Sequence, residues 1–164
     1  MNDVVDLLLS QWERQRPDLD VSSMGVVGRL SRASRVVGRA VEGGLAEEGL
    51  EAWEFDVLAT LRRSGEPYSL TPKELVGMMM VGSAAMTHRV DRLVSRGLVT
   101  RETDPANRRR TLVTLAPEGL ELIDRAVVHH VANQRGLLAG LDEKEREQLA
   151  DLLRKLLLSL GDTV

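Results

Sequence analysis

Two helical segments separated by a short turn, within residues 71–97, constrain the fold of this chain more than any other feature. The first segment opens with LTPKEL, where Thr71 can cap a helix, Pro72 suits the first helical position and Glu74 can bond back to the cap. A second helix follows after a short turn, so the pattern predicts a helix-turn-helix unit.

The second segment of this unit covers residues 83–96 and ends at Gly97, a residue typical of helix termination. Apolar residues recur at helical spacing, so we expect one side to pack in the core: Met86, Val90, Leu93 and Val94. The outward side carries small and hydrogen-bonding residues: Ala84, Ala85, His88, Arg92 and Ser95. This side is available to a ligand.

After Gly97 the pattern changes from helical to β-rich. Two short runs carry apolar and β-branched residues, with Leu98 and Thr100 in the first and Leu112, Val113 and Leu115 in the second. The connection TDPANRRR contains Asp104, whose side chain can bond nearby backbone, and Pro105, which fixes a backbone dihedral. The pattern predicts a β-hairpin with a basic tip.

Helical periodicity covers the rest of the chain. We expect five further helices, at residues 4–15, about 24–47, 52–63, about 117–138 and about 143–160. The last one has an apolar stripe that suits either the core or a partner helix: Leu149, Leu152, Leu153, Leu156, Leu157 and Leu160. The expected fold is a single domain of 164 residues, mostly α with a small β-hairpin (α+β).

Composition and the amino terminus exclude several classes of protein. The chain has no cysteine, and its first residues match neither a signal peptide nor a membrane span, so we expect a soluble cytoplasmic protein without a membrane partner. Adjacent His129 and His130 point about 100° apart on a helix, which favours surface or interface positions over metal binding. No nucleophile with a base, phosphate-binding glycine loop or metal cluster is present, so we expect neither an enzyme nor a cofactor.

Positive charge is concentrated in one region. The chain has a formal net charge of −3, yet residues 83–110 contain seven arginines and three acidic residues. Aromatic residues make up only 2%, which disfavours stacking on single strands and leaves duplex DNA as the expected ligand. The candidate DNA contacts on the second helical segment are Ser83, Ala84, Ala85, Thr87, His88, Arg89 and Arg92. The alternative is a solvated helix face.

The hairpin tip adds Arg108, Arg109 and Arg110 to the candidate DNA contacts. An extended tip can enter a minor groove, whose negative potential attracts guanidinium groups. Arg108 or Arg109 is best placed to do so. The alternative is a turn whose charges serve only solubility.

The segment VDRLVSRGLVTRETDPANRRRTLVTLAPEG, residues 90–119, resembles the MarR family of winged helix-turn-helix transcription regulators, and the resemblance covers nearly the whole chain. It implies a homodimer, with residues of about 50–115 forming the DNA-binding lobe and residues of about 1–47 and 117–164 forming the helical dimerisation region. One position departs from the family: Asn107 stands where an aspartate usually precedes the principal wing arginine, here Arg109.

Four residues resemble the urate-responsive branch of that family: Trp12, Asp56, Arg89 and Arg101. The resemblance implies that these side chains line a pocket for urate or a related purine. There, Arg89 would pair with the anion, the added charge would repel Asp56, and the recognition helix would move. The alternative is that Asp56 and Arg89 are an ion pair or separate surface charges, and that Trp12 belongs to the core.

These features predict a DNA-binding transcriptional regulator, a repressor released from a pseudo-palindromic operator by a small anion such as urate. Two alternatives stay open. One is a regulator of the same family that responds to another small anion or a phenolic compound. The other is a winged-helix module that binds proteins without a ligand.

Overall fold

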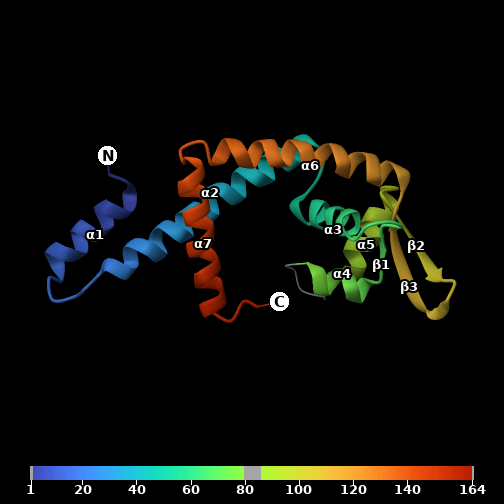
Figure 1. The fold of residues 1–164 in the computed structure, drawn as a ribbon, viewed down its shortest axis with the longest axis horizontal. Helices are drawn as coiled ribbons and strands as arrows, with labels where there is room; N and C mark the ends of the chain where they lie inside the picture. Colours follow the sequence, from blue (N-terminus) through green and yellow to red (C-terminus); the bar gives the residue numbers. More distant parts are fainter. Residues whose placement is uncertain (1, 80–85, 164) are drawn as a thin grey trace. The chain divides into compact units, whose positions relative to one another are not determined.

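The computed structural model describes residues 2–79 and 86–163, which belong to two compact units, Met1–Gly43 and Gly44–Val164 (Figure 1). Each unit contains helices, and the three strands lie in the second. Among the described residues, no helix combines the length and apolarity needed to cross a lipid bilayer.

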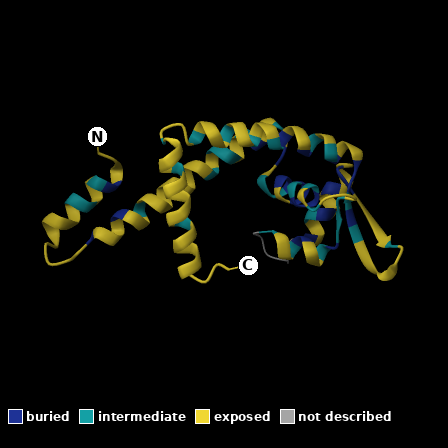
Figure 2. Ribbon diagram, in the orientation of Figure 1, coloured by how far each residue is buried: buried dark blue, intermediate teal, exposed yellow. Residues whose placement is uncertain are grey.

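The first unit contains α1 (Val4–Gln15) and most of α2 (Ser22–Glu47), close to the predicted positions. Arg29 of α2 joins the two helices through a 2.8 Å bond to Asp3 and a 2.6 Å bond to Asp6. Most residues of the unit are exposed (Figure 2). Large apolar side chains are among them: Val4, Leu7, Leu8, Val26 and Val27.

The second unit is built around a three-helix core and a small sheet (Figure 1). Its elements are α3 (Ala52–Arg63), β1 (Ser69–Leu70), α4 (Pro72–Met78), α5 (Met86–Ser95), β2 (Val99–Asp104), β3 (Asn107–Leu115), α6 (Pro117–Leu137) and α7 (Glu143–Ser159). The mostly helical fold with a β-hairpin is confirmed.

Reciprocal caps fix where two of these helices begin. At α4 the Thr71 hydroxyl accepts the backbone N–H of Glu74, and the Glu74 carboxylate accepts the backbone N–H of Thr71. Asp142 and Glu145 form the same arrangement at the start of α7. The first of these capping boxes was predicted from the sequence, because Thr71 and Glu74 stand three positions apart.

The sheet has the order β1-β3-β2, and both pairs of neighbours are antiparallel. β2 and β3 form the predicted hairpin, with Val99 opposite Leu115 at its base. β1 was not predicted, since two residues are too few to show an alternating pattern. It adds Ser69 opposite Thr114, and their hydroxyls share a 2.8 Å hydrogen bond.

The core lies where α3, α5, α6 and the base of the hairpin meet (Figure 2). One face of α3 is buried together with Leu50: Glu54, Val57, Leu58 and Leu61. On α5 the apolar residues Met86, Val90 and Leu93 are buried as expected. Val94 is 39% exposed, so its assignment to the core was wrong. It lies at the edge of the apolar stripe, where α5 turns toward solvent.

Gly119 of α6 permits a close approach between that helix and the residue before β2. A Cβ atom at this position would lie 1.9 Å from the carbonyl oxygen of Leu98. No side chain fits in that space. The glycine therefore sets how near α6 can come to the base of the wing.

No residue of α7 is buried within the described chain. Its leucine stripe is open to solvent along most of its length, with exposed side chains at Leu149, Leu152, Leu156, Leu157 and Leu160. The stripe therefore forms no core within the second unit, which favours the other interpretation, a partner helix. An apolar surface of this extent on a helix is typical of a protein interface.

Candidate nucleic-acid interface

α5 and the β2–β3 hairpin carry the predicted DNA contacts that the structure describes. Thr87 and His88 are exposed on α5, as expected for side chains that address a duplex. Ser83, Ala84 and Ala85 lie outside the described residues. Of the predicted contacts near the start of this segment, the structure therefore describes the Thr87 hydroxyl and the His88 ring.

Arg92 lies toward the start of α3, whereas the sequence placed it on the outward side of α5. Its Nη2 atom donates a 2.5 Å hydrogen bond to Oε1 of Glu51. Helical spacing puts Arg92 only about 40° from His88. The long side chain nevertheless bends toward a carboxylate on another element, which the periodicity of one helix does not reveal.

Trp53 of α3 lies beneath two arginines of α5. Its ring centroid is 4.8 Å from Cζ of Arg92 and 5.7 Å from Cζ of Arg89, within the range of cation–π attraction. The indole Nε1 donates a 2.7 Å hydrogen bond to Oε2 of Glu51. This bond and the one from Arg92 hold the pKa of Glu51 below its usual range. We define Glu51, Trp53 and Arg92 as the Glu51 cluster.

The Glu51 cluster was not predicted from the sequence. One signal was present in the sequence. Arg89, Arg92 and Arg96 recur at intervals of three and four residues, which places them along one flank of a helix. Such a basic flank requires an acidic or aromatic neighbour when it faces protein, and Glu51 and Trp53 supply both.

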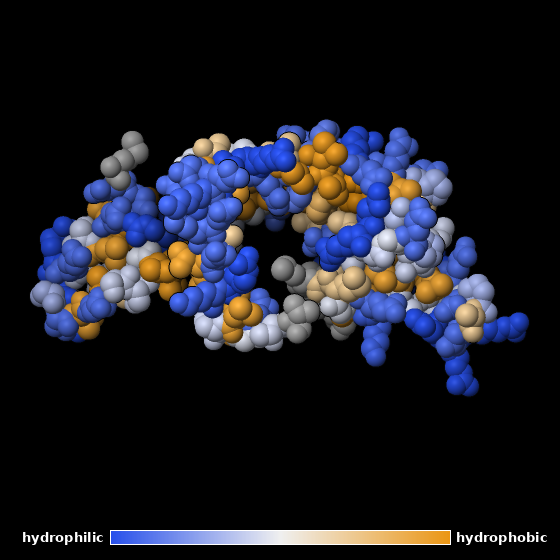
Figure 3. Space-filling model, viewed as in Figure 1, coloured by the Kyte–Doolittle hydropathy of each residue, from blue (hydrophilic) through white to orange (hydrophobic). Residues whose placement is uncertain are grey.

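The wing, defined as the β2–β3 hairpin, presents two arginines without carboxylate partners. Arg108 and Arg109 are exposed and form no ion pair within the described part of the chain. Hydrophilic side chains extend from this tip into solvent at the lower right of Figure 3. Arg110 differs, because it lies 3.3 Å from Glu74 and 3.9 Å from Asp104. Arg108 and Arg109 are thus the wing charges available to a phosphate.

The turn at the wing tip is held by side chains that bond to backbone. Asp104 Oδ1 accepts the N–H of Ala106 at 2.8 Å, as predicted. Asn107 Oδ1 accepts the N–H of Arg109 at 3.1 Å. Asn107 therefore orders the backbone at Arg109, although it lacks the charge of the aspartate that the family resemblance led us to expect.

A groove lies between the start of α4 and the wing, lined by Thr71, Pro72, Lys73, Glu74, Arg109 and Arg110. Lys73 is exposed and adds a positive charge beside Arg109. Lys73 was not predicted as a DNA contact. Its position directly after Thr71 and Pro72, in the first turn of a capped helix, was the signal that the sequence carried. A lysine and an arginine lining one groove suit a backbone phosphate.

Three of the four candidate ligand residues lie in the second unit. Asp56 is exposed on α3, and Arg101 of β2 forms a 2.7 Å ion pair with Asp91 of α5. Arg89 is half-buried, and its buried Nη1 atom has no hydrogen-bond partner among the described residues. No ion pair joins Asp56 to Arg89 within the described chain, which leaves their charges separate.

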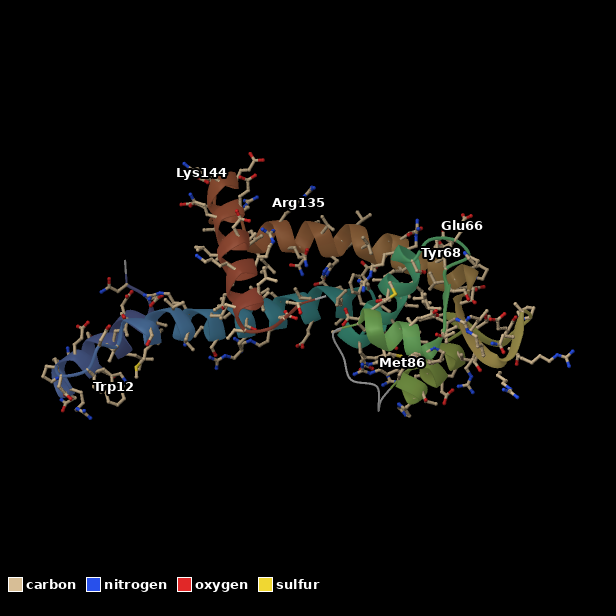
Figure 4. The ribbon with its side chains drawn as sticks, turned by 60° about the horizontal axis from the view of Figure 1, so that its bottom comes forward. Trp12, Glu66, Tyr68, Met86, Arg135 and Lys144 are labelled. Atoms are coloured by element: carbon tan, nitrogen blue, oxygen red, sulfur yellow. The ribbon has the colours of Figure 1, made fainter. Side chains whose placement is uncertain are left out.

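The fourth candidate, Trp12, lies in the first unit and is labelled on α1 in Figure 4. Its side chain is 44% exposed, so it is not a core residue of that unit. Trp12 lines an apolar groove between α1 and α2 with Val5, Leu8, Leu9, Met24 and Val27. The structure describes this groove separately from Asp56, Arg89 and Arg101.

His129 and His130 of α6 have different surroundings. Nδ1 of His129 is hydrogen-bonded to Glu48, whereas the His130 ring stacks on Phe55 with 4.5 Å between centroids. Within residues 2–79 and 86–163, no three histidine, cysteine or acidic side chains are grouped in a way that could hold a metal ion. Both histidines tie α6 to neighbouring elements.

Comparisons with known proteins connect this geometry to a family. A sequence model of the MarR family matches residues 48–110, which contain α3, α4, α5 and the wing tip. The HTH-type transcriptional regulator PecS of Dickeya dadantii is 41% identical over 146 residues, which cover 89% of this chain and 88% of PecS.

Two solved structures are also similar. A mutant of MarR from Escherichia coli complexed with operator DNA matches with a TM-score of 0.71 and 26% identity, covering 95% of this chain and 99% of that one. BpsR of Bordetella bronchiseptica, whose DNA binding is regulated by 6-hydroxynicotinic acid, matches with a TM-score of 0.70 and 30% identity. That match covers 80% of this chain and 91% of BpsR.

Proposed function

The chain belongs to the MarR family of DNA-binding transcriptional regulators, and we propose that it is a repressor released from its operator by a small anion such as urate. Its relatives are regulators rather than enzymes. The single observation that carries the ligand proposal is the buried Nη1 atom of Arg89, which has no partner among the described residues. A buried cationic donor without a partner is costly, and an anion would satisfy it.

The proposed DNA-binding surface combines the start of α5 with the wing. Ser83, Ala84, Ala85, Thr87 and His88 would address the major groove, while Arg108 and Arg109 would enter the minor groove. Arg89, Arg92 and Arg110 complete the set as phosphate contacts. Support comes from the exposure of Thr87 and His88 and from the two wing arginines that form no ion pair.

The proposed assembly is a homodimer of one MarR-like domain. Residues of about 1–47 and 117–164 would form its helical dimerisation region, and about 50–115 the DNA-binding lobe. The exposed leucines of α7 support this division, because a second copy would cover them. A dimer would present two lobes to half-sites about one helical turn apart.

The proposed ligand residues are Asp56, Arg89 and Arg101 of the second unit, and Trp12 of the first unit is proposed from the family resemblance alone. A planar anion would pair with Arg89, and its charge would repel Asp56 on α3. Because α3 and α5 are joined by Glu51 to Arg92 and by Glu54 to Arg96, a shift of α3 would move the recognition helix. The regulation of BpsR by 6-hydroxynicotinic acid supports a planar heteroaromatic anion, and another small anion or a phenolic compound is the alternative.

The test is a urate titration of wild type and Asp56→Asn, by calorimetry and by release of a duplex that covers the DNA upstream of the gene. We expect urate to weaken wild-type DNA binding about tenfold, equivalent to about 1.4 kcal/mol of coupling. Asp56→Asn should bind DNA normally and respond poorly. Glu121→Gln, an exposed charge change on α6, is the matched control. No heat with wild type, or a full response in Asp56→Asn, would refute the ligand site and leave DNA binding intact.

A further inference from the structure

The flank of α5 that faces the start of α3 is a continuous row of positive charge. Arg89 and Arg92 lie over the ring of Trp53, and one turn later Arg96 bonds to Glu54 over 2.6 Å. Of these arginines, Arg92 is the one held by an exposed carboxylate: the Arg92 and Glu51 side chains are 45% and 55% exposed. This ion pair is therefore accessible from solvent, and a polyanion such as DNA can approach it.

We propose that Trp53 is a positioning residue for DNA binding, and that a DNA phosphate replaces the Glu51 carboxylate on Arg92 when the protein binds a duplex. The proposal goes beyond the assignment of Arg92 as a DNA contact. It states that the contact forms by exchange of one anion, the Glu51 carboxylate, for another, and that Trp53 keeps Arg92 oriented during that exchange.

The geometry favours replacement of Glu51 by a phosphate on Arg92 over loss of Glu51 without a replacement. Glu51 engages the Nη2 atom of Arg92, and a phosphate oxygen presents the same acceptor chemistry as a carboxylate oxygen. The Trp53 ring holds the guanidinium at 4.8 Å through its face, a contact that does not depend on which anion binds the edge. Trp53 therefore keeps Arg92 oriented while the anion changes.

The exchange also predicts whether Glu51 strengthens or weakens DNA binding. In the free protein its carboxylate competes with DNA for Arg92, so it lowers affinity for every duplex, whatever the sequence. Glu51→Gln retains an oxygen that can accept the indole N–H and removes the competing charge. We expect this variant to bind DNA about two- to fivefold more tightly, the range that one exposed ion pair supplies.

A double-mutant cycle tests this competition in the full-length protein with a random-sequence duplex of about 30 base pairs at low salt, long enough for two half-sites. The four proteins are wild type, Glu51→Gln, Arg92→Gln and the double variant. Tightening by Glu51→Gln should disappear when Arg92 is absent. Glu118→Gln removes an exposed charge elsewhere, and its effect should be smaller and independent of Arg92. Equal tightening with and without Arg92 overturns the exchange and reduces Glu51 to a general charge effect.

Fluorescence supplies an independent readout, because the chain has two tryptophans and Trp12→Phe leaves Trp53 as the only one. Adding the duplex should change Trp53 emission. When a phosphate replaces Glu51 on Arg92, the freed carboxylate can move away from the indole N–H that it accepts in the free protein. In the Arg92→Gln background the same saturating DNA should leave the emission unchanged. An unchanged spectrum at full saturation of the Trp12→Phe protein overturns the proposal even though DNA is bound. Failure of wild type to bind any duplex would instead contradict DNA binding itself.

Discussion

Arg96 Nη1 lies 2.6 Å from Oε2 of Glu54, a carboxylate that is 1% exposed. The same oxygen accepts the backbone N–H of Glu51 at 2.9 Å, so it caps the start of α3 and also holds Arg96, directly after the end of α5. Oε1 of Glu54 has no partner within the described chain. One half-exposed arginine therefore carries most of the compensation for a buried charge.

Removing that arginine should destabilise the fold. Arg96→Ala leaves the Glu54 carboxylate buried without a cation, and we expect the free energy of unfolding to fall by about 1 to 3 kcal/mol. Urea unfolding measures the change. Arg135→Ala, at an exposed α6 arginine labelled in Figure 4, should change stability by less than about 0.5 kcal/mol. Equal losses in the two variants would mean that the Arg96–Glu54 pair is dispensable.

Two glycines of α6 should respond oppositely to the same substitution. At Gly119 an added Cβ would lie 1.9 Å from the Leu98 carbonyl oxygen, so Gly119→Ala should destabilise the protein by about 1 to 3 kcal/mol or more. At Gly136 no atom lies within 4 Å of the added Cβ, and alanine should stabilise by about 0.5 to 1 kcal/mol. Thermal unfolding of both variants checks the prediction. A tolerated Gly119→Ala would show that α6 can move away from Leu98.

The wing arginines should determine the salt dependence of DNA binding. If Arg108 and Arg109 each contact a phosphate, the double alanine variant should reduce the slope of log K against log salt by roughly 0.9 per lost contact. Mobility-shift titrations at several salt concentrations measure it. Arg110→Ala is the matched comparison, and we expect a smaller loss because Glu74 and Asp104 already compensate Arg110. Unchanged affinity and slope in the double variant would remove the wing from the interface.

Glu48 should make stability depend on pH in the acid range. Hydrogen bonds from His129 and Arg125 hold the pKa of Glu48 below its ordinary value of 4.5. A lowered folded-state pKa means that the stabilisation is present above about pH 4.5 and is lost as pH falls through the folded value. The difference in unfolding free energy between wild type and Glu48→Gln should therefore be largest near neutral pH and disappear in acid. A constant difference from pH 7 to about 3 would show that these bonds do not favour the ionised form.

Much of the fold could be predicted because its signals are local. The capping pairs Thr71 with Glu74 and Asp142 with Glu145 mark helix starts within four residues, and the change of period after Gly97 marks the hairpin. β1 escaped because its pairing partner, Thr114, lies 45 residues away. Its two residues are too few to show the alternating pattern that distinguishes a strand from a turn.

The site was predicted less completely, since its charges are arranged by contacts between elements. The exposed Arg108 and Arg109 were expected at the wing tip, and local sequence sufficed because neither side chain forms an ion pair within the described chain. Arg92 was expected to point outward, and only the fold brings Glu51 and Trp53 beside it. Long-range pairing of this kind is invisible to the periodicity of a single helix.

The short strand β1 also has a mechanical consequence. It binds only the base of β3, at Val113 and Thr114, and Tyr68 just before it accepts the N–H of Leu115. The outer half of the wing is exposed on every residue from Pro105 to Thr111, and an exposed ion pair joins its Arg110 to Glu74 of α4. The hairpin is thus held by backbone pairing at its base and by an exposed ion pair nearer its tip, so its base is the more firmly held end.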